Sequence, residues 1–267
     1  MSDTLFTTEA SSFVPTAHAR GPWDPQALHG GAPAALITDA FEAHEPGPGM
    51  GIARLNFELL RPVPMSPLDI SIEVVRAGRR VQELGAELRS GGRLICRASA
   101  LLVARVPGDL PAGAAGEQGE RMPAPEEASE LSFALEAPAG ADPAHASFGA
   151  TGMQMRWIDD PYTPGPCRVW MRPRRALLPG RELSPLARAA AVADFGNGVS
   201  ATLPFERYLF INADLTLHLA REPRGDWIGL DSRTILHEGG MGIAESALHD
   251  REGPIGRAFQ TLVVAPR

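Results

Sequence analysis

The sequence repeats itself at a distance of 160 residues, and this repeat limits the folds that the chain can adopt. Residues 97–103 resemble residues 257–263. Three alternating apolar residues also recur, so that Leu55, Phe57 and Leu59 correspond to Leu215, Leu217 and Leu219. Because the offset is even, the same face of each strand stays apolar in both copies. We therefore expect two similar units rather than one irregular domain.

Each copy consists of a helical pattern followed by segments with strand periodicity. The helices are predicted at 32–42 and 183–198. In the second helix, Ser184 suits the N-cap and Pro185 the first helical position, and we expect positive φ angles in Gly196-Asn197-Gly198 to end it. Strands are predicted at 55–59, 68–75, 81–89, 93–106, 153–157, 167–172, 208–219, 227–236, 241–250 and 255–264. The fold class is therefore α+β, with antiparallel meanders.

The segment between the two copies has a different composition. Pro, Gly, Ala and Glu dominate residues 107–145, a composition typical of linkers, with one short ordered piece expected near 131–135. The predicted organisation is an N-terminal unit at 1–106, a linker at 107–145 and a C-terminal unit at 146–267.

The composition excludes several classes of chemistry. The chain has no lysine, which rules out a Schiff base, a lysine base and a P-loop. Its net charge of −7 argues against a nucleic-acid partner. Cys96 and Cys167 stand far apart without partners at metal-binding spacing, so we expect no metal site and a reducing compartment. No secretory signal or membrane-spanning run is visible, so we expect a cytoplasmic protein with no membrane contact and no cofactor.

Several stretches resemble the acyl-CoA thioesterase II family, whose members have a double hotdog fold. The stretches are HGGAPAALITDAFE (29–42), LNFELLRPVP (55–64), LSPLARAAAVADFGNG (183–198), INADLTLHLAREPRGDW (211–227) and GRAFQTLVV (256–264). The resemblance implies two repeats, each with a long helix wrapped by an antiparallel sheet. It also implies hydrolysis of acyl-CoA to a free acid and coenzyme A. Because the two hotdog units are fused in one chain, a homodimer or higher oligomer is optional.

The same resemblance implies three residues that position and activate a water molecule. The family uses an Asp on the second helix, a Ser or Thr on the following strand and a Gln on the last strand. Asp194, Thr216 and Gln260 match these positions, with Asn212 as the alternative to Thr216. An Asn amide can orient water because it both donates and accepts hydrogen bonds. Asp194 would act as the base for that water.

The repeat provides a second argument for placing the site in the C-terminal unit. An offset of about 155 places Asp39 on Asp194, whereas the offset of 160 places Asn56 on Thr216 and Ala100 on Gln260. The N-terminal unit would thus keep an acid but lack the hydroxyl and the amide. Gly30 and Gly31, in a Gly-rich helix entry, are candidates for binding the thioester carbonyl, although close packing of the helix on the sheet explains them as well.

Two other functions remain open at this point. A non-catalytic acyl-CoA or lipid-binding protein could use the same space beside the helix. A hotdog hydratase is expected to have an Asp and a His close together at a helix entry, and the sequence indicates no such pair near Asp194.

Overall fold

The computed structural model describes residues 3–44, 49–105, 108, 121–131 and 146–267. In these ranges eleven strands form one antiparallel sheet, with the order β4-β5-β6-β3-β10-β13-β12-β11-β8-β7 and with β9 paired to β13. The strands contributed by the first half are β3 (Met50–Leu59), β4 (Asp69–Arg76), β5 (Val81–Ser90) and β6 (Arg93–Ala104). Those of the second half are β7 (Met153–Trp157), β8 (Cys167–Pro173), β9 (Tyr208–Asn212), β10 (Asp214–Leu219), β11 (Ile228–Leu236), β12 (Met241–Asp250) and β13 (Gly253–Pro266).

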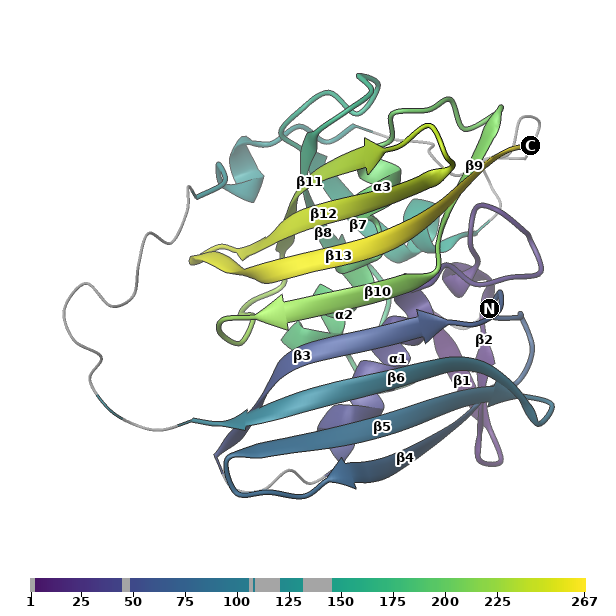
Figure 1. The fold of residues 1–267 in the computed structure, drawn as a ribbon, viewed down its shortest axis with the longest axis vertical. Coiled ribbons are helices and arrows are strands. Elements are labelled where there is room, and N and C mark those ends of the chain that lie inside the picture. Colours follow the sequence, from purple (N-terminus) through teal and green to yellow (C-terminus); the bar gives the residue numbers. More distant parts are fainter. Residues whose placement is uncertain (1–2, 45–48, 106–107, 109–120, 132–145) are drawn as a thin grey trace.

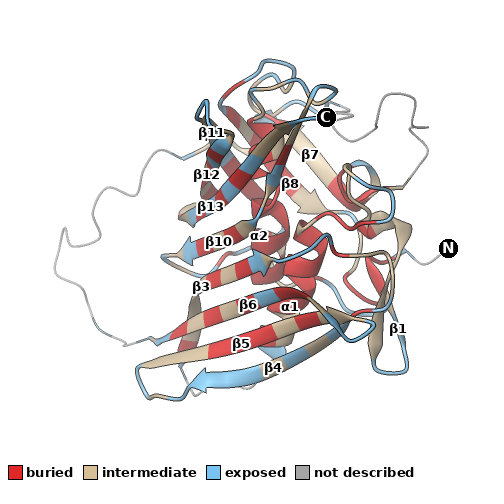
Figure 2. Cartoon of the chain, turned by 45° about the vertical axis from the view of Figure 1, so that its right-hand side comes forward, coloured by how far each residue is buried: buried red, intermediate tan, exposed pale blue. Residues whose placement is uncertain are grey.

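The helices α1 (Gly31–Ala43) and α2 (Pro185–Ala193) lie side by side on one face of this sheet (Figure 1). Smaller elements complete the description: a hairpin of β1 (Phe6–Glu9) and β2 (Ser12–Pro15), the short helical turns η1 (Ala17–Ala19), η2 (Pro125–Glu127) and η3 (Phe148–Gly152), and the short helix α3 (Gly196–Val199). Figure 2 shows that the buried residues are concentrated in the two helices and in the sheet positions that face them. No helix of the described residues is both long and apolar enough to cross a bilayer.

The two halves meet where β3 pairs with β10. In this antiparallel pair Asn56 lies opposite Thr216, and Leu55 and Phe57 lie opposite Leu217 and Leu215. Asn56 and Thr216 are 160 residues apart and pair directly, whereas Leu55 pairs with Leu217 and Phe57 with Leu215. A two-fold axis through the Asn56–Thr216 pair would produce this register, because it would exchange Leu55 with Leu215 and Phe57 with Leu217.

The two helices approach each other closely because both present small residues. A Cβ atom on Gly31 would lie 2.3 Å from the carbonyl oxygen of Ala191, so only glycine fits there. The alanines of α2, including Ala187, Ala190 and Ala191, are fully buried. Each larger side chain at this contact would separate the backbones and open voids in the core.

The start of the second helix is confirmed, but its predicted end is wrong. The Ser184 hydroxyl accepts a hydrogen bond from the Ala187 N–H, and Pro185 is the first helical residue. The chain then leaves the helix at Asp194 and resumes as α3 over Gly196–Val199, and no residue of Gly196-Asn197-Gly198 has a positive φ. Gly196 serves close packing instead, since a Cβ there would lie 2.7 Å from Ser246 Oγ and 2.9 Å from Gln260 Oε1.

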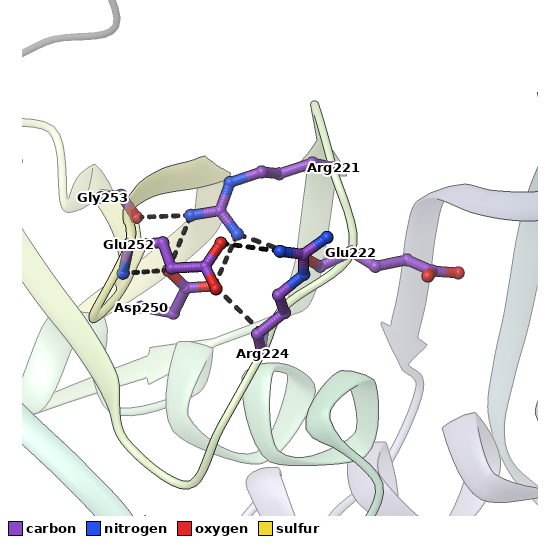
Figure 3. Close-up of polar contacts among 6 residues, drawn as sticks. All are labelled: Arg221, Glu222, Arg224, Asp250, Glu252 and Gly253. Carbon is purple, nitrogen blue, oxygen red and sulfur yellow. Dashed lines mark hydrogen bonds and ion pairs between the residues drawn. The ribbon is translucent and has the colours of Figure 1, made fainter. Parts of the chain in front are cut away.

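An ion pair between the buried Asp250 and the partly exposed Arg221 fixes the loop that follows β10. Both Asp250 carboxylate oxygens accept from the Arg221 guanidinium, at 2.5 and 2.6 Å, and also from the N–H groups of Arg224 and Glu252 (Figure 3). Burial opposes ionisation of Asp250, but Arg221 and the two N–H groups outweigh it and lower the pKa of this carboxyl. The pair thus connects the loop after β10 to the β12–β13 turn.

Of the linker predicted at 107–145, the structure describes residue 108 and residues 121–131, and the ordered piece expected near 131–135 lies almost entirely outside the described residues. Within 121–131 there is the short turn η2, and Ser129 forms an isolated bridge with Trp157 at the end of β7. Part of the segment expected to be a linker is therefore packed against the C-terminal half.

Candidate active site

Asp194 lies at the break between α2 and α3, and three segments converge on its carboxylate. It is 4% exposed. Its Oδ1 atom accepts from Asn212 Nδ2 of β9 at 2.8 Å and lies 3.4 Å from Gln260 Nε2 of β13. Its Oδ2 atom lies 2.8 Å from Nδ1 of His29, which directly precedes the N-cap of α1. A buried carboxylate requires such partners, because desolvation of an isolated charge is costly.

Gln260 is held at both ends of its amide. Its Nε2 donates to the Asp194 carbonyl oxygen at 3.0 Å, and its Oε1 accepts from the Asn197 N–H at 2.9 Å. The side chain is 2% exposed. In this arrangement Gln260 fixes the backbone and side chain of Asp194 and the start of α3, and both ends of its amide have protein partners.

Thr216 is not brought to Asp194, which corrects the expectation that the two share a site. Leu215 lines the same pocket as Asp194, and successive side chains of a strand point to opposite faces. Thr216 therefore points to the opposite face of the sheet, where its Oγ1 donates to Asn56 Oδ1 at 2.6 Å. Asn212, the alternative considered from sequence, is the residue that contacts Asp194.

The two glycines at the entry of α1 have different surroundings. Gly30 borders the pocket, and a Cβ on it would lie 2.8 Å from Asp194 Oδ2. Gly31 is required by the contact with α2, and its N–H points to His29 Nδ1 at 3.1 Å. The packing explanation therefore accounts for Gly31, whereas Gly30 allows the carboxylate to approach the helix entry.

A narrow pocket next to Asp194 is almost entirely apolar. It contains about 210 Å³ of empty space, including its open part, and its lining is Gly30, Pro33, Ala34, Ile37, Phe57, Leu59, Cys96, Asp194 and Leu215. Seven residues of helix separate Gly30 from Ile37, a rise of roughly 10 Å. Burial raises the pKa of the Cys96 thiol to about 12, so the thiol is neutral at physiological pH. The lining therefore favours contact with uncharged hydrocarbon over contact with charged groups.

The contact between His29 and Asp194 was not predicted from the sequence. The expectation that no histidine lies near Asp194 is wrong, because the two residues are far apart in sequence but adjacent in the fold. The His29 ring stacks on Phe195 with centroids 4.2 Å apart and lies 5.1 Å from Phe148. The available signal was the HGG turn before the predicted N-terminal helix, but only the packing of α1 against α2 places this turn at the end of α2.

Among the described residues, no group of three or more His, Cys, Asp or Glu side chains could hold a metal ion. The described contacts of the site join one carboxylate, one imidazole and two carboxamides beside an apolar pocket. Such groups can transfer protons and orient polar atoms of a substrate.

Comparisons with known proteins identify relatives of the whole chain. Residues 19–103 match the model of the acyl-CoA thioesterase N-terminal domain, and residues 117–264 match that of the acyl-CoA thioesterase C-terminal domain. No curated protein sequence is significantly similar to the chain.

Solved structures share its hotdog fold. An Alicyclobacillus acidocaldarius protein of unknown function with a hot dog fold is 17% identical, with a TM-score of 0.71 and coverage of 98% of this chain and 95% of that one. A Thermobifida fusca protein provisionally assigned as a thioesterase II is 17% identical, with a TM-score of 0.73 and coverage of 98% and 96%. The acyl-CoA thioesterase II TesB2 of Mycobacterium marinum is 15% identical, with a TM-score of 0.65 and coverage of 98% and 94%.

Proposed function

Because the chain belongs to the acyl-CoA thioesterase family, we propose that it hydrolyses acyl-CoA thioesters to a free acid and coenzyme A. The observation that carries this proposal is the buried Asp194 carboxylate, oriented by two carboxamides at the edge of an apolar pocket. We further infer a double hotdog in which the site lies between the two repeats. A cytoplasmic location and an optional homo-oligomer remain predictions.

In the proposed reaction Asp194 is the base and water is the nucleophile. Asp194 takes a proton from water as the water oxygen adds to the thioester carbonyl carbon. The C–S bond then breaks, and the coenzyme A thiolate receives the proton. Asn212 and Gln260 both approach Oδ1 and restrain that side of the carboxylate, which reduces the reorganisation needed at the moment of reaction. Asn212 replaces Thr216 in this proposal, because Thr216 faces away from the pocket.

The acyl chain is proposed to occupy the pocket along α1. Apart from Asp194 and the neutral Cys96 thiol, its lining side chains are hydrocarbon, so burial of each methylene would stabilise the complex by about 0.8 kcal/mol. A second carboxylate on the acyl group would be desolvated there without a cation among the lining residues. We therefore expect neutral acyl groups to be preferred over dicarboxylic ones.

A thiol-release assay tests the proposal. Saturated acyl-CoAs of increasing length are incubated with the protein and a thiol reagent, and Asp194→Asn is compared with Asp39→Asn. We expect release by the wild type and by Asp39→Asn, and a loss of at least about 100-fold in Asp194→Asn. Unchanged turnover in a folded Asp194→Asn variant would contradict the assignment. Thermal stabilisation by acyl-CoA without any thiol release would instead indicate a binding protein.

The contact between His29 and Asp194 favours a second candidate, the hydration of a 2-enoyl thioester. In that reaction the water oxygen adds to C3 and a proton is delivered to C2, so a base and an acid are both required. The 2.8 Å contact places two such groups in one site. With crotonyl-CoA, loss of the enoyl absorbance without thiol release would favour hydration, and thiol release would favour hydrolysis.

A further inference from the structure

His29 and Asp194 connect the two halves of the chain. His29 has no role in the hydrolysis proposed above. His29 lies in the loop before α1, and Asp194 at the end of α2. Their side chains are 9% and 4% exposed, so the contact is shielded from water. Hydrogen bonds to a charged group are stronger than neutral ones, and a low local dielectric strengthens them further.

The distances restrict where the proton can be. A ring nitrogen and a carboxylate oxygen 2.8 Å apart need a proton between them, because two unprotonated acceptors would repel each other. The Gly31 N–H also lies 3.1 Å from the same Nδ1 atom, and Nδ1 can accept from it only when it carries no proton. The contact with Asp194 is the shorter of the two, 2.8 Å against 3.1 Å, so the geometry favours the tautomer in which Nδ1 carries the proton and donates it to Oδ2.

This donor completes the restraint on the carboxylate. Asn212 and Gln260 both approach Oδ1, so without His29 nothing in the described contacts holds Oδ2. The His29 ring stacks on Phe195, and its main chain is held by the backbone N–H, which donates to the Ala19 carbonyl at 3.0 Å.

We propose that His29 is a positioning residue for Asp194, with its Nδ1–H fixing Oδ2 so that the carboxylate is aligned for proton transfer from water. The expected change in kcat rests on the proposed hydrolysis, whereas the proton on His29 Nδ1 does not. His29 is not among the residues that line the pocket. Its loss should therefore lower kcat and leave KM nearly unchanged, because substrate contacts remain while the base is misaligned.

Kinetic comparison of three variants tests the proposal. His29→Leu keeps apolar bulk beside Phe195 but removes the donor, and we expect kcat to fall by about 10- to 100-fold. His29→Asn restores an N–H donor near the Nδ1 position and should recover most of that loss. His249→Leu is the matched control, since His249 is also buried and its Nδ1 has no hydrogen-bond partner in the structure. Melting temperatures establish that each variant is folded.

Nitrogen NMR of histidine-labelled protein provides a readout that does not depend on turnover. We expect the His29 signal, identified by its loss in His29→Asn, to show a protonated Nδ1. An unprotonated Nδ1 in the wild type, or an unchanged kcat in folded His29→Leu, overturns the inference. A wild type that releases no thiol refutes the proposed hydrolysis instead, and the NMR result still decides whether Nδ1 donates to Asp194.

Discussion

The two ends of the α1–α2 pair are built alike but are chemically different. At one end the entry of α1, with His29 and Gly30, meets Asp194 at the end of α2. At the other end the entry of α2 meets acids near the end of α1, where Arg181 lies 3.1 Å from Asp39 and the Ser184 hydroxyl donates to Glu42 at 2.5 Å. Each end thus places a carboxylate beside the start of the opposite helix.

The difference lies in what surrounds each carboxylate. Asp194 is held by neutral carboxamides and an imidazole, whereas Asp39 is paired with a guanidinium that is always charged. The strand position of Gln260 is occupied by Ala100 in the first half, which supplies no amide. The carboxamides that orient Asp194 have no counterpart among the described contacts of Asp39, so we propose that the base lies at the Asp194 end.

The largest expected effect is on the free energy of unfolding, at two positions that the repeat relates to each other. The repeat places Asp250 on Ser90, which makes hydrogen bonds to Ser66 and Pro67 rather than an ion pair. Asp250→Asn should lower the free energy of unfolding by about 2 to 3 kcal/mol, less than for a fully buried pair because Arg221 is partly exposed. Ser90→Ala, the matched variant, should cost about 1 kcal/mol or less. Urea denaturation measures both.

The same variant has a pH signature. The pKa of Asp250 is lowered in the folded state, so its stabilisation is present above the unfolded carboxyl pKa and is lost as the pH falls through the folded value. The difference in stability between wild type and Asp250→Asn should therefore shrink on acidification below about pH 4. A difference that stays constant down to pH 2 would show that the ion pair is not its source.

The next effect concerns the space that Gly30 leaves for the carboxylate. Gly30 has a helical φ of −59°, so alanine is compatible with its backbone, but the new Cβ would lie within 3.0 Å of both Asp194 oxygens. We expect Gly30→Ala to displace Asp194 and to lower kcat by about 100-fold. Gly198→Ala is the control, since a Cβ there meets nothing within 4 Å. Equal activity in the two folded variants would contradict the proposed position of the base.

Asn212 and Thr216 can be separated by a smaller effect. Asn212→Leu removes the donor at 2.8 Å from Asp194, and we expect kcat to fall by about 10-fold, equivalent to about 1.4 kcal/mol. Thr216→Val removes a hydrogen bond to Asn56 on the opposite face of the sheet and should leave kcat unchanged. A fall in kcat for Thr216→Val with no change for Asn212→Leu would show that Thr216, and not Asn212, acts in the site.

The smallest effect is expected at Asp39. Burial raises the pKa of its carboxyl, and Arg181 partly counteracts the shift. The folded protein therefore holds this proton more tightly than the unfolded chain, so stability falls as the pH rises through the interval between the two pKa values. Asp39→Asn should remove this slope and be at least as stable as wild type at neutral pH. Thermal melts from pH 3 to pH 8 test the sign.

Much of the fold was predictable because its signals are local. Apolar alternation at Leu215, Leu217 and Leu219 identified a strand, and Ser184-Pro185 identified a helix start, since both depend on neighbouring residues. The repeat also related two residues that are distant in sequence, since Asn56 and Thr216 are paired between β3 and β10. Local patterns could not show that Gly196 begins a second helix, because its neighbours Ser246 and Gln260 come from distant strands.

By itself, then, the sequence predicted the order of elements and, through its resemblance to a known family, the family itself and an amide on the last strand near Asp194. Only the tertiary structure decided which side chains face Asp194. It turned Thr216 away, brought Asn212 in and placed His29 from the other half within 2.8 Å. The physical reason is that periodicity fixes which face of an element is buried, whereas the meeting of two helix ends depends on how closely Gly31 and Ala191 let the helices pack.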